Sequence, residues 1–138
     1  MEIRHKKAPY PQYKGWERHW LVKGAEMLAY VDTHPAHGFN AVKLSNLYVP
    51  PGYRGHNYGR RVIKLAMASH PESDLVITPN PWKDKAVPRE KLASIYESLG
   101  FKKMAGIRYE SLMLFERPFA FKLGAVAGRS VTNMTDLL

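Results

Sequence analysis

Hydrophobic and polar residues follow a strand pattern through the first third of the chain. Trp20–Val22 and Glu26–Val31 flank a Lys-Gly-Ala turn, which predicts a β-hairpin, and residues 33–38 predict a loop. Met1–Lys6 is expected to form a first strand. Ala41–Val49 predicts a longer strand whose alternate residues face opposite sides of a sheet, with Val42, Leu44, Asn46 and Tyr48 on one side and Ala41, Lys43, Ser45, Leu47 and Val49 on the other.

Two amphipathic helices are expected after this strand. The first begins beyond Asn57, ends before Pro71, and carries an apolar stripe formed by Tyr58, Val62, Leu65, Ala66 and Ser69. In the second, between Pro88 and Gly100, apolar residues recur at i, i+3, i+4 and i+7, at Leu92, Ile95, Tyr96 and Leu99. Pro88 suits the first turn of a helix, and Gly100 suits a left-handed C-cap.

The remaining apolar segments complete an alternating order of strands and helices. Leu75–Thr78 predicts a short buried strand, and further strands are expected near Lys103–Ile107 and from Tyr109 to Glu116. The order β–(β–β)–β–α–β–α–β–β, over residues 1–117, predicts an α/β domain built on a mixed sheet. The chain of 138 residues is the length of a single domain, and residues 118–138 form a C-terminal extension.

The segment from Leu47 to Ala66 carries the chemistry that is easiest to recognise. A strand ends at a Pro-Pro-Gly turn, a basic loop with two glycines follows, and a helix begins directly after the loop. Unpaired N–H groups and the dipole at a helix N-terminus attract phosphate groups, and Arg54, Arg60 and Arg61 add positive charge. The loop matches neither the P-loop nor the three-glycine dinucleotide pattern. The segment therefore predicts a site for another kind of phosphate-bearing ligand.

This loop resembles the acyl-CoA-binding motif of the GNAT acyltransferase superfamily, Arg/Gln-x-x-Gly-x-Gly/Ala. Arg54, Asn57 and Gly59 occupy its three positions, so Asn replaces the middle glycine; Asn tolerates left-handed backbone angles, which would keep the shape of the loop. The later run Ile-Tyr-Glu-Ser-Leu-Gly-Phe resembles the GNAT signature in which a helix with a Tyr leads into Gly-Phe and a strand. The resemblance implies a central, mostly antiparallel sheet flanked by helices. Residues 8–20 would be a shortened version of the family's first helical region.

The resemblance also implies roles for individual residues. Acetyl-CoA would be the acyl donor, with its thioester arm along the strand end and its pyrophosphate in the loop; the residues concerned are Leu47, Tyr48, Val49, Arg54, Gly55, His56, Asn57, Tyr58, Gly59 and Arg60. A backbone N–H of the strand would polarise the thioester carbonyl. Tyr96 occupies the place of the tyrosine that protonates the leaving thiolate. Arg89 stands where many members have an Asn that contacts CoA.

The sequence leaves the general base open. Many GNAT members carry a Glu on the strand before the phosphate loop, but Ala41–Val49 contains no acid, and the nearest candidates are Glu26, Asp32, His34 and His37. An amine can also react without a base through its neutral fraction. His34 and His37 have the spacing of two metal ligands, but no third ligand is near them in the sequence and there is no Cys, so we expect no metal site.

Charge and composition restrict the partners. The net charge of +9 favours anionic partners such as a nucleotide, a nucleic acid or an acidic protein surface. Aromatic residues in the basic segment 10–20 can stack on nucleotides. No apolar run has the length of a membrane span, and no secretory signal is present, which predicts a cytoplasmic protein. The many apolar residues of 118–138 predict that this extension packs on its own domain or on a second subunit of a homo-oligomer.

The function best supported by the sequence is transfer of an acetyl group from acetyl-CoA to a primary amine of a protein or a small molecule. Two alternatives stay open: a GNAT-fold binding or structural protein that has lost catalysis, and a small basic nucleic-acid-binding domain. Four features favour the loss of catalysis: Asn57 in place of a glycine, Arg89 in place of the family's Asn, the acid-free strand and the shortened first helical region. The sequence does not identify the acceptor.

Overall fold

The computed structural model describes residues 2–7, 15–36, 40–80, 87–104 and 111–118. The elements appear in the predicted order, which confirms the mixed α/β fold class. They are β1 (Glu2–Lys7), β2 (Glu17–Lys23), β3 (Glu26–Pro35), β4 (Ala41–Tyr48), the 3₁₀ turn η1 (Pro51–Tyr53), α1 (Tyr58–Ala68), β5 (Asp74–Ile77), α2 (Arg89–Ser98), β6 (Lys102–Lys103) and β7 (Met113–Phe115).

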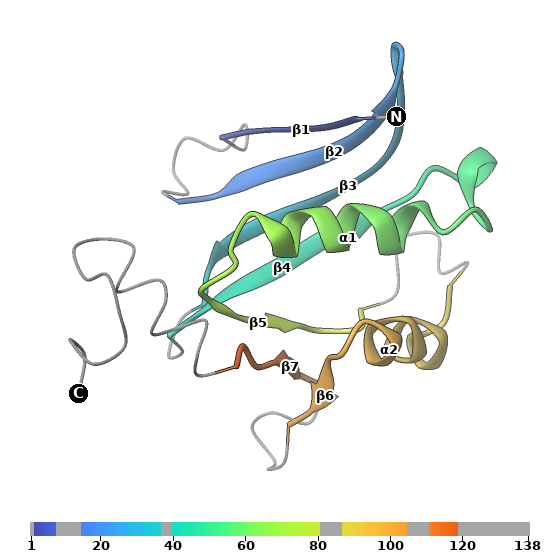
Figure 1. Cartoon of the computed structure of the whole chain (residues 1–138). Coiled ribbons are helices and arrows are strands. Elements are labelled where there is room, and N and C mark those ends of the chain that lie inside the picture. The colour runs from blue at the N-terminus through green and yellow to red at the C-terminus, as the bar shows by residue number, and fades with distance from the viewer. Residues whose placement is uncertain (1, 8–14, 37–39, 81–86, 105–110, 119–138) are drawn as a thin grey trace.

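The described strands form one mixed sheet in the order β1-β2-β3-β4-β5-β7-β6. Every neighbouring pair is antiparallel except β4 and β5, which are parallel and are joined through α1. Figure 1 shows α1 lying along one face of the sheet, in front of β3 and β4. Because α1 links two parallel neighbours, its N-terminus lies at the end of the sheet where β4 finishes.

The hydrophobic core lies between the helices and one face of the sheet. α1 buries Val62, Ile63, Ala66 and Met67, whereas Leu65, which the sequence places on the apolar stripe, is 37% exposed. The buried residues form two adjacent rows along the helix, Val62 with Ala66 and Ile63 with Met67. α1 is therefore rotated relative to the predicted stripe, and both rows face the sheet. α2 follows its predicted stripe, with Leu92 and Tyr96 buried and Ile95 and Leu99 packed at the edge of the core.

The N-terminal hairpin is longer than its apolar pattern predicts. β3 continues through Thr33 to Pro35, where the sequence predicts a loop, and β2 begins at Glu17, within the segment expected to hold a helical region. Polar residues enter these strands because they pair across them: His19 and Thr33 are buried, with His19 Nε2 2.9 Å from Thr33 Oγ1. Residues 8–14 lie outside the described part of the chain.

The C-terminal strands are short in the part that the structure describes. β6 covers Lys102–Lys103 and overlaps the start of the strand predicted at 103–107. β7 covers Met113–Phe115 and lies within the strand predicted at 109–116. Residues 105–110 of these two predicted strands lie outside the described residues. Arg117 fastens this end of the sheet: its backbone N–H donates to Asp74, and its guanidinium donates to the carbonyl oxygens of Ser73, Met67 and His70. The extension from residue 119 is outside the described residues, so its packing remains a prediction.

A bulge interrupts β4 between Ser45 and Tyr48. Asp32 on β3 pairs with Ser45 on β4, and Tyr30 pairs with Tyr48. The two partners are two residues apart on β3 but three residues apart on β4. One extra residue therefore stands on β4, and Asn46 has the left-handed φ of 57° that such an insertion requires. The predicted alternation along β4 is wrong beyond this point, because the extra residue reverses which side chains face the core.

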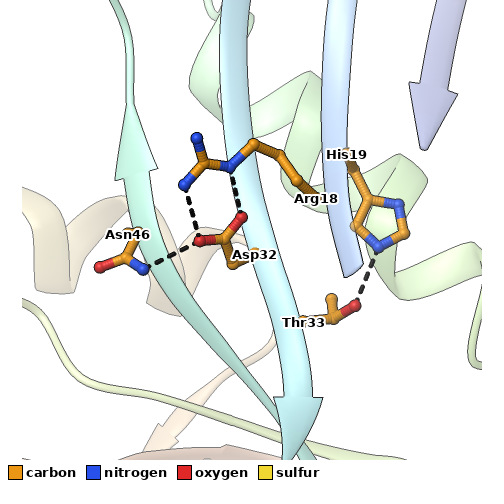
Figure 2. A network of polar contacts seen from close by, with 5 residues as sticks. All are labelled: Arg18, His19, Asp32, Thr33 and Asn46. Carbon is orange, nitrogen blue, oxygen red and sulfur yellow. Dashed lines mark hydrogen bonds and ion pairs between the residues drawn. The ribbon is translucent and has the colours of Figure 1, made fainter. Parts of the chain in front are cut away.

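The carboxylate of Asp32 holds this bulge in place. Figure 2 shows it between Arg18 on β2 and Asn46 on β4. Arg18 donates to both carboxylate oxygens at 2.7 and 3.0 Å, and the Asn46 amide donates to one of them at 2.9 Å. Asp32 is fully buried. A buried carboxylate with a bidentate arginine and a further donor is well compensated, so the contact fixes three strands in one register.

The C-terminus of α2 confirms the predicted glycine cap. Gly100 has a φ of 103°, its N–H donates to the Glu97 carbonyl, and the N–H of Phe101 donates to the Tyr96 carbonyl. This pair of bonds is a Schellman motif, which satisfies carbonyls at the end of a helix. A Cβ on Gly100 would lie 2.8 Å from the ring of Phe115. Glycine is therefore required both for its backbone angle and for its size.

We expect Gly100→Ala to lower the free energy of unfolding by about 2–4 kcal/mol, through left-handed strain and the clash with Phe115. Gly24→Ala is the matched control, because Gly24 also has a positive φ, of 61°, but a Cβ there would meet nothing within 4 Å. The control should lose only about 1–2 kcal/mol. Urea unfolding measures both values, and equal losses would show that the contact with Phe115 has no effect.

We expect Asn46→Ala to destabilise the fold by about 2–4 kcal/mol, because Ala is strained at positive φ and removes a hydrogen bond to a carboxylate. Asn46→Gly should be at least about 1 kcal/mol milder, since glycine adopts this angle freely. Asn40→Ala, at an exposed position just before β4, is the control and should leave stability unchanged. If Asn46→Gly were as destabilising as Asn46→Ala, the backbone angle would not be the constraint.

Candidate functional site

β4 and β5 separate from one another at the bulge. They pair only from Ala41 to Leu44 on β4 and from Asp74 to Ile77 on β5, whereas β4 remains paired with β3 as far as Tyr48. Within the described residues, the pairing of β4 with β5 ends at Leu44. Figure 1 shows the two strands diverging toward the N-terminus of α1. We call this divergence the fork; its closed end, the apex, is at Leu44 and Ser45.

An open strand edge of this kind can bind an extended ligand arm by backbone hydrogen bonds. Of the three residues that the sequence assigns to this arm, Leu47 and Tyr48 are half-buried on the open part of β4, and Val49 is buried just beyond it. The Val49 carbonyl already accepts a hydrogen bond from Arg54 Nε at 2.9 Å. The open edge therefore lies mainly on Ser45–Tyr48, and Arg54 fixes the point where the chain leaves the strand.

The loop after β4 delivers the chain to α1 in a conformation that exposes the helix N-terminus. Gly55 has a φ of 86°, and Asn57, the N-cap residue, has a φ of 63°. Asn57 thus adopts the left-handed angle expected of it in place of a glycine. Its side chain does not cap the helix; its carbonyl accepts the N–H of Arg61 at 3.1 Å. The N–H groups before Arg61 lie in the first turn and have no intrahelical acceptor.

Two arginines of this loop differ in their surroundings. The guanidinium of Arg54 lies 5.8 Å from the ring centre of Tyr48 and is anchored to Val49. Arg60 donates from Nη1 to the Asn57 side chain at 3.1 Å, while its Nε is buried with no hydrogen-bond partner among the described residues. A buried donor without an acceptor costs free energy, and an anion at the helix N-terminus would relieve that cost.

Gly59 lies in the first turn of α1 against the end of β4. A Cβ built there would be 3.5 Å from Val49 and 4.0 Å from Leu47, which is ordinary contact. Alanine would therefore fit, in keeping with the Gly/Ala alternative at this motif position. The first turn of α1 therefore lies close to the side chains of Leu47 and Val49 at the end of β4.

Three aromatic rings pack together in and beside the loop. Tyr58 is stacked with His56, at 5.5 Å between ring centres, and lies edge-on to Tyr53 at 6.4 Å. The hydroxyl of Tyr53 donates to Glu26 at 2.8 Å, and this hydrogen bond raises the pKa of Tyr53 above its ordinary value. The contact ties the start of β3 to the loop and occupies Glu26, one of the candidate bases.

The two site residues predicted on α2 lie in different surroundings. Tyr96 is 2% exposed and packs against Phe101, with 6.3 Å between ring centres. Burial raises the pKa of the Tyr96 phenol far above its ordinary value, so the hydroxyl keeps its proton at neutral pH. Arg89 is exposed at the start of α2, where it donates to Ser111 Oγ at 3.4 Å. Their roles toward a ligand remain predictions.

The candidate bases are separated by the structure. Asp32 is occupied by Arg18 and Asn46, and Glu26 by Tyr53. His34 Nε2 lies 2.8 Å from Ser45 Oγ at the apex of the fork, and His37 is outside the described residues. Sequence reasoning did not single out Ser45, and it placed Asn46 in a regular strand. The Asn itself, a residue type that tolerates left-handed backbone angles, was the available signal.

Two further observations concern the described residues alone. No three of their His, Asp or Glu side chains lie together in a way that could hold a metal ion. Neither α1 nor α2 has the length and apolar character needed to cross a membrane.

Comparison with known proteins adds structural relatives. No family model matches the chain, and no curated protein matches its sequence. An aminoglycoside 6'-N-acetyltransferase from Enterococcus faecium superposes with a TM-score of 0.60 and 15% identity, over 86% of this chain and 99% of its own. The Bacillus subtilis N-acetyltransferase YlbP, solved with coenzyme A, superposes with a TM-score of 0.54 and 16% identity. The match covers 74% of this chain and 68% of YlbP. A chain of the DNA-bound AtaT–AtaR complex superposes with a TM-score of 0.56 and 22% identity, over 74% of this chain and 68% of its own.

These similarities are in structure and extend over most of each partner. At such low identity they establish the fold and not the activity. The strand order, the single parallel pair and the helix between its strands agree with the architecture that the two sequence motifs imply. The chain therefore has the fold of the GNAT acetyltransferases.

Proposed function

We propose that this protein is an N-acyltransferase that moves an acetyl group from acetyl-CoA to a primary amine. The observation that carries the proposal is the continuity between the open edge of β4 and the N-terminus of α1. A ligand with a phosphate at one end and an extended amide-bearing arm at the other matches these two features together. Acetyl-CoA has this construction, and YlbP, which has the same fold, was solved with coenzyme A.

The donor is proposed to bind in two parts. Its pyrophosphate accepts hydrogen bonds from the first N–H groups of α1 and from Arg60, whose buried Nε has no partner among the described residues. Its pantetheine arm bonds the backbone of Ser45–Tyr48 inside the fork. The acetyl group then lies near the apex, and a β4 N–H polarises its carbonyl as negative charge develops there.

The reaction follows from this placement. The neutral amine attacks the thioester carbon and a C–N bond forms; the nitrogen loses a proton, ultimately to water, and the C–S bond breaks as the tetrahedral intermediate collapses. Tyr96 is proposed to give its proton to the departing thiolate and to regain one from water. Burial raises the pKa of this phenol, so the hydroxyl is protonated at neutral pH but is a weaker acid than an exposed phenol.

The first test is the affinity for acetyl-CoA, measured by calorimetry. The double variant Arg54→Ala/Arg60→Ala should bind more weakly by a few kcal/mol, because it removes the charge-assisted bonds of Arg60, which contribute about 1.5–3 kcal/mol each, and the hydrogen bond by which Arg54 fastens the loop to Val49. Lys64→Ala, an exposed position further along α1, is the control and should bind normally. Unchanged affinity in a folded double variant would refute the loop as the phosphate site. Tight binding without turnover on any amine would instead support a GNAT-fold binding protein.

The second test is Tyr96→Phe, which keeps the ring in the core and removes only the hydroxyl. Loss of a general acid should lower kcat by about 10²–10⁴-fold with little change in the Kd for acetyl-CoA. Circular dichroism and Tm should show that the fold is intact. A normal kcat in that folded variant would leave Tyr96 a packing residue.

A further inference from the structure

His34 and Ser45 form a hydrogen-bonded pair at the apex of the fork. Ser45 is the first β4 residue beyond Leu44, the last one paired with β5. Ser45 pairs in register with Asp32, and Lys43 pairs in register with His34. The side chains of these four residues therefore share one face of the sheet. Leu44 and Thr33, which alternate with them, are buried on the other face, with the core. The pair therefore lies on the face opposite α1.

The hydrogen bonds of His34 determine which ring nitrogen carries the proton. Nδ1 lies 3.1 Å from the Pro35 carbonyl oxygen, which can only accept, so Nδ1 is the donor in the neutral ring. Nε2 then has a free lone pair, and it accepts the hydroxyl proton of Ser45 at 2.8 Å. The basic nitrogen of His34 is thus directed at the apex through the Ser45 hydroxyl.

The indole of Trp16 holds the imidazole in this orientation. The two rings are stacked at 3.8 Å with an interplanar angle of 5°. Stacking on an aromatic face limits rotation of the imidazole. A proton acceptor held in this way needs little reorganisation when it becomes charged.

We propose that His34 is the general base for the acceptor amine and that Ser45 relays the proton. This inference rests on the proposed acetyl transfer. As the amine attacks the thioester carbon, its proton passes to Ser45 Oγ and the Ser45 hydroxyl proton passes to His34 Nε2. The C–N bond forms, the C–S bond breaks, and the imidazolium later returns its proton to water. The acceptor accordingly enters on the face opposite α1.

The charged groups around His34 are compatible with this role. Lys43 lies directly opposite on β4, Asp32 precedes it by two residues on β3, and Arg18 approaches from β2. Arg18 and Asp32 form an ion pair, so they largely neutralise each other. Lys43 is the charged side chain directly across the strand pair from the imidazole.

The decisive variant is His34→Gln, which retains a polar side chain and removes the base. We expect kcat/KM at neutral pH to fall about 10²–10⁴-fold, with an unchanged Kd for acetyl-CoA. In the wild-type protein kcat/KM should rise with pH as His34 loses its proton. His34→Gln should lack this ionisation and recover only at higher pH, where the neutral fraction of the amine increases.

Two variants accompany it. Ser45→Ala interrupts the relay and should lower kcat/KM while the Kd for acetyl-CoA stays the same. His70→Gln removes another imidazole, beyond the C-terminal end of α1, and should leave the rate and its pH profile unchanged. The same amine is used throughout, so its own ionisation contributes equally to each profile.

The outcomes separate this inference from the function on which it rests. If the wild-type protein transfers acetyl groups and His34→Gln keeps both the rate and the ionisation, the inference fails and the proposed function stands. An acetyl group trapped on Ser45, found by mass spectrometry of the protein mixed with acetyl-CoA alone, would also overturn it by making Ser45 a nucleophile. If the wild-type protein acetylates no amine, the proposed function fails and this inference fails with it.

Discussion

The buried carboxylate of Asp32, bound between Arg18 and Asn46, sets the geometry of the central strands. It joins β2, β3 and β4 and holds the one residue of β4 that does not fit a regular strand. Without a left-handed residue there, β4 would continue in register and could pair with a longer β5. A compensated charge inside the sheet therefore creates the fork, and the fork creates the open strand edge.

The loop and helix beyond β4 complete what the bulge begins. Arg54 fastens the chain to the end of the strand, Asn57 turns it in the left-handed conformation, and α1 begins with its first N–H groups exposed. Attraction for a phosphate and an edge for an extended arm then lie along one continuous path. The two features come from consecutive segments of the chain, so a few local conformations determine the relative position of both halves of the proposed donor site.

The sequence predicted the order of elements, both helices and the glycine cap of α2, because hydrophobic periodicity and turn residues are local signals. It predicted a hairpin that is too short, because Thr33 and His19 are polar residues whose hydrogen bond forms only across the two strands. It also missed the bulge. The reversal of β4 depends on Asn46 finding Asp32, fourteen positions away, and no local pattern records such a contact. His34 was one of several candidate bases until the register of β3 and β4 placed it beside Ser45.

The open edge of β4 also affects the dynamics of the sheet. The Ala41–Leu44 segment lies between two strands, but the segment beyond Leu44 pairs only with β3 among the described residues. Local opening should therefore expose the second segment to solvent far more often than the first. In hydrogen–deuterium exchange the boundary between slow and fast amides would fall within a single strand. An occupied fork would move that boundary outward, so the same bulge that weakens the sheet makes ligand binding visible in its exchange rates.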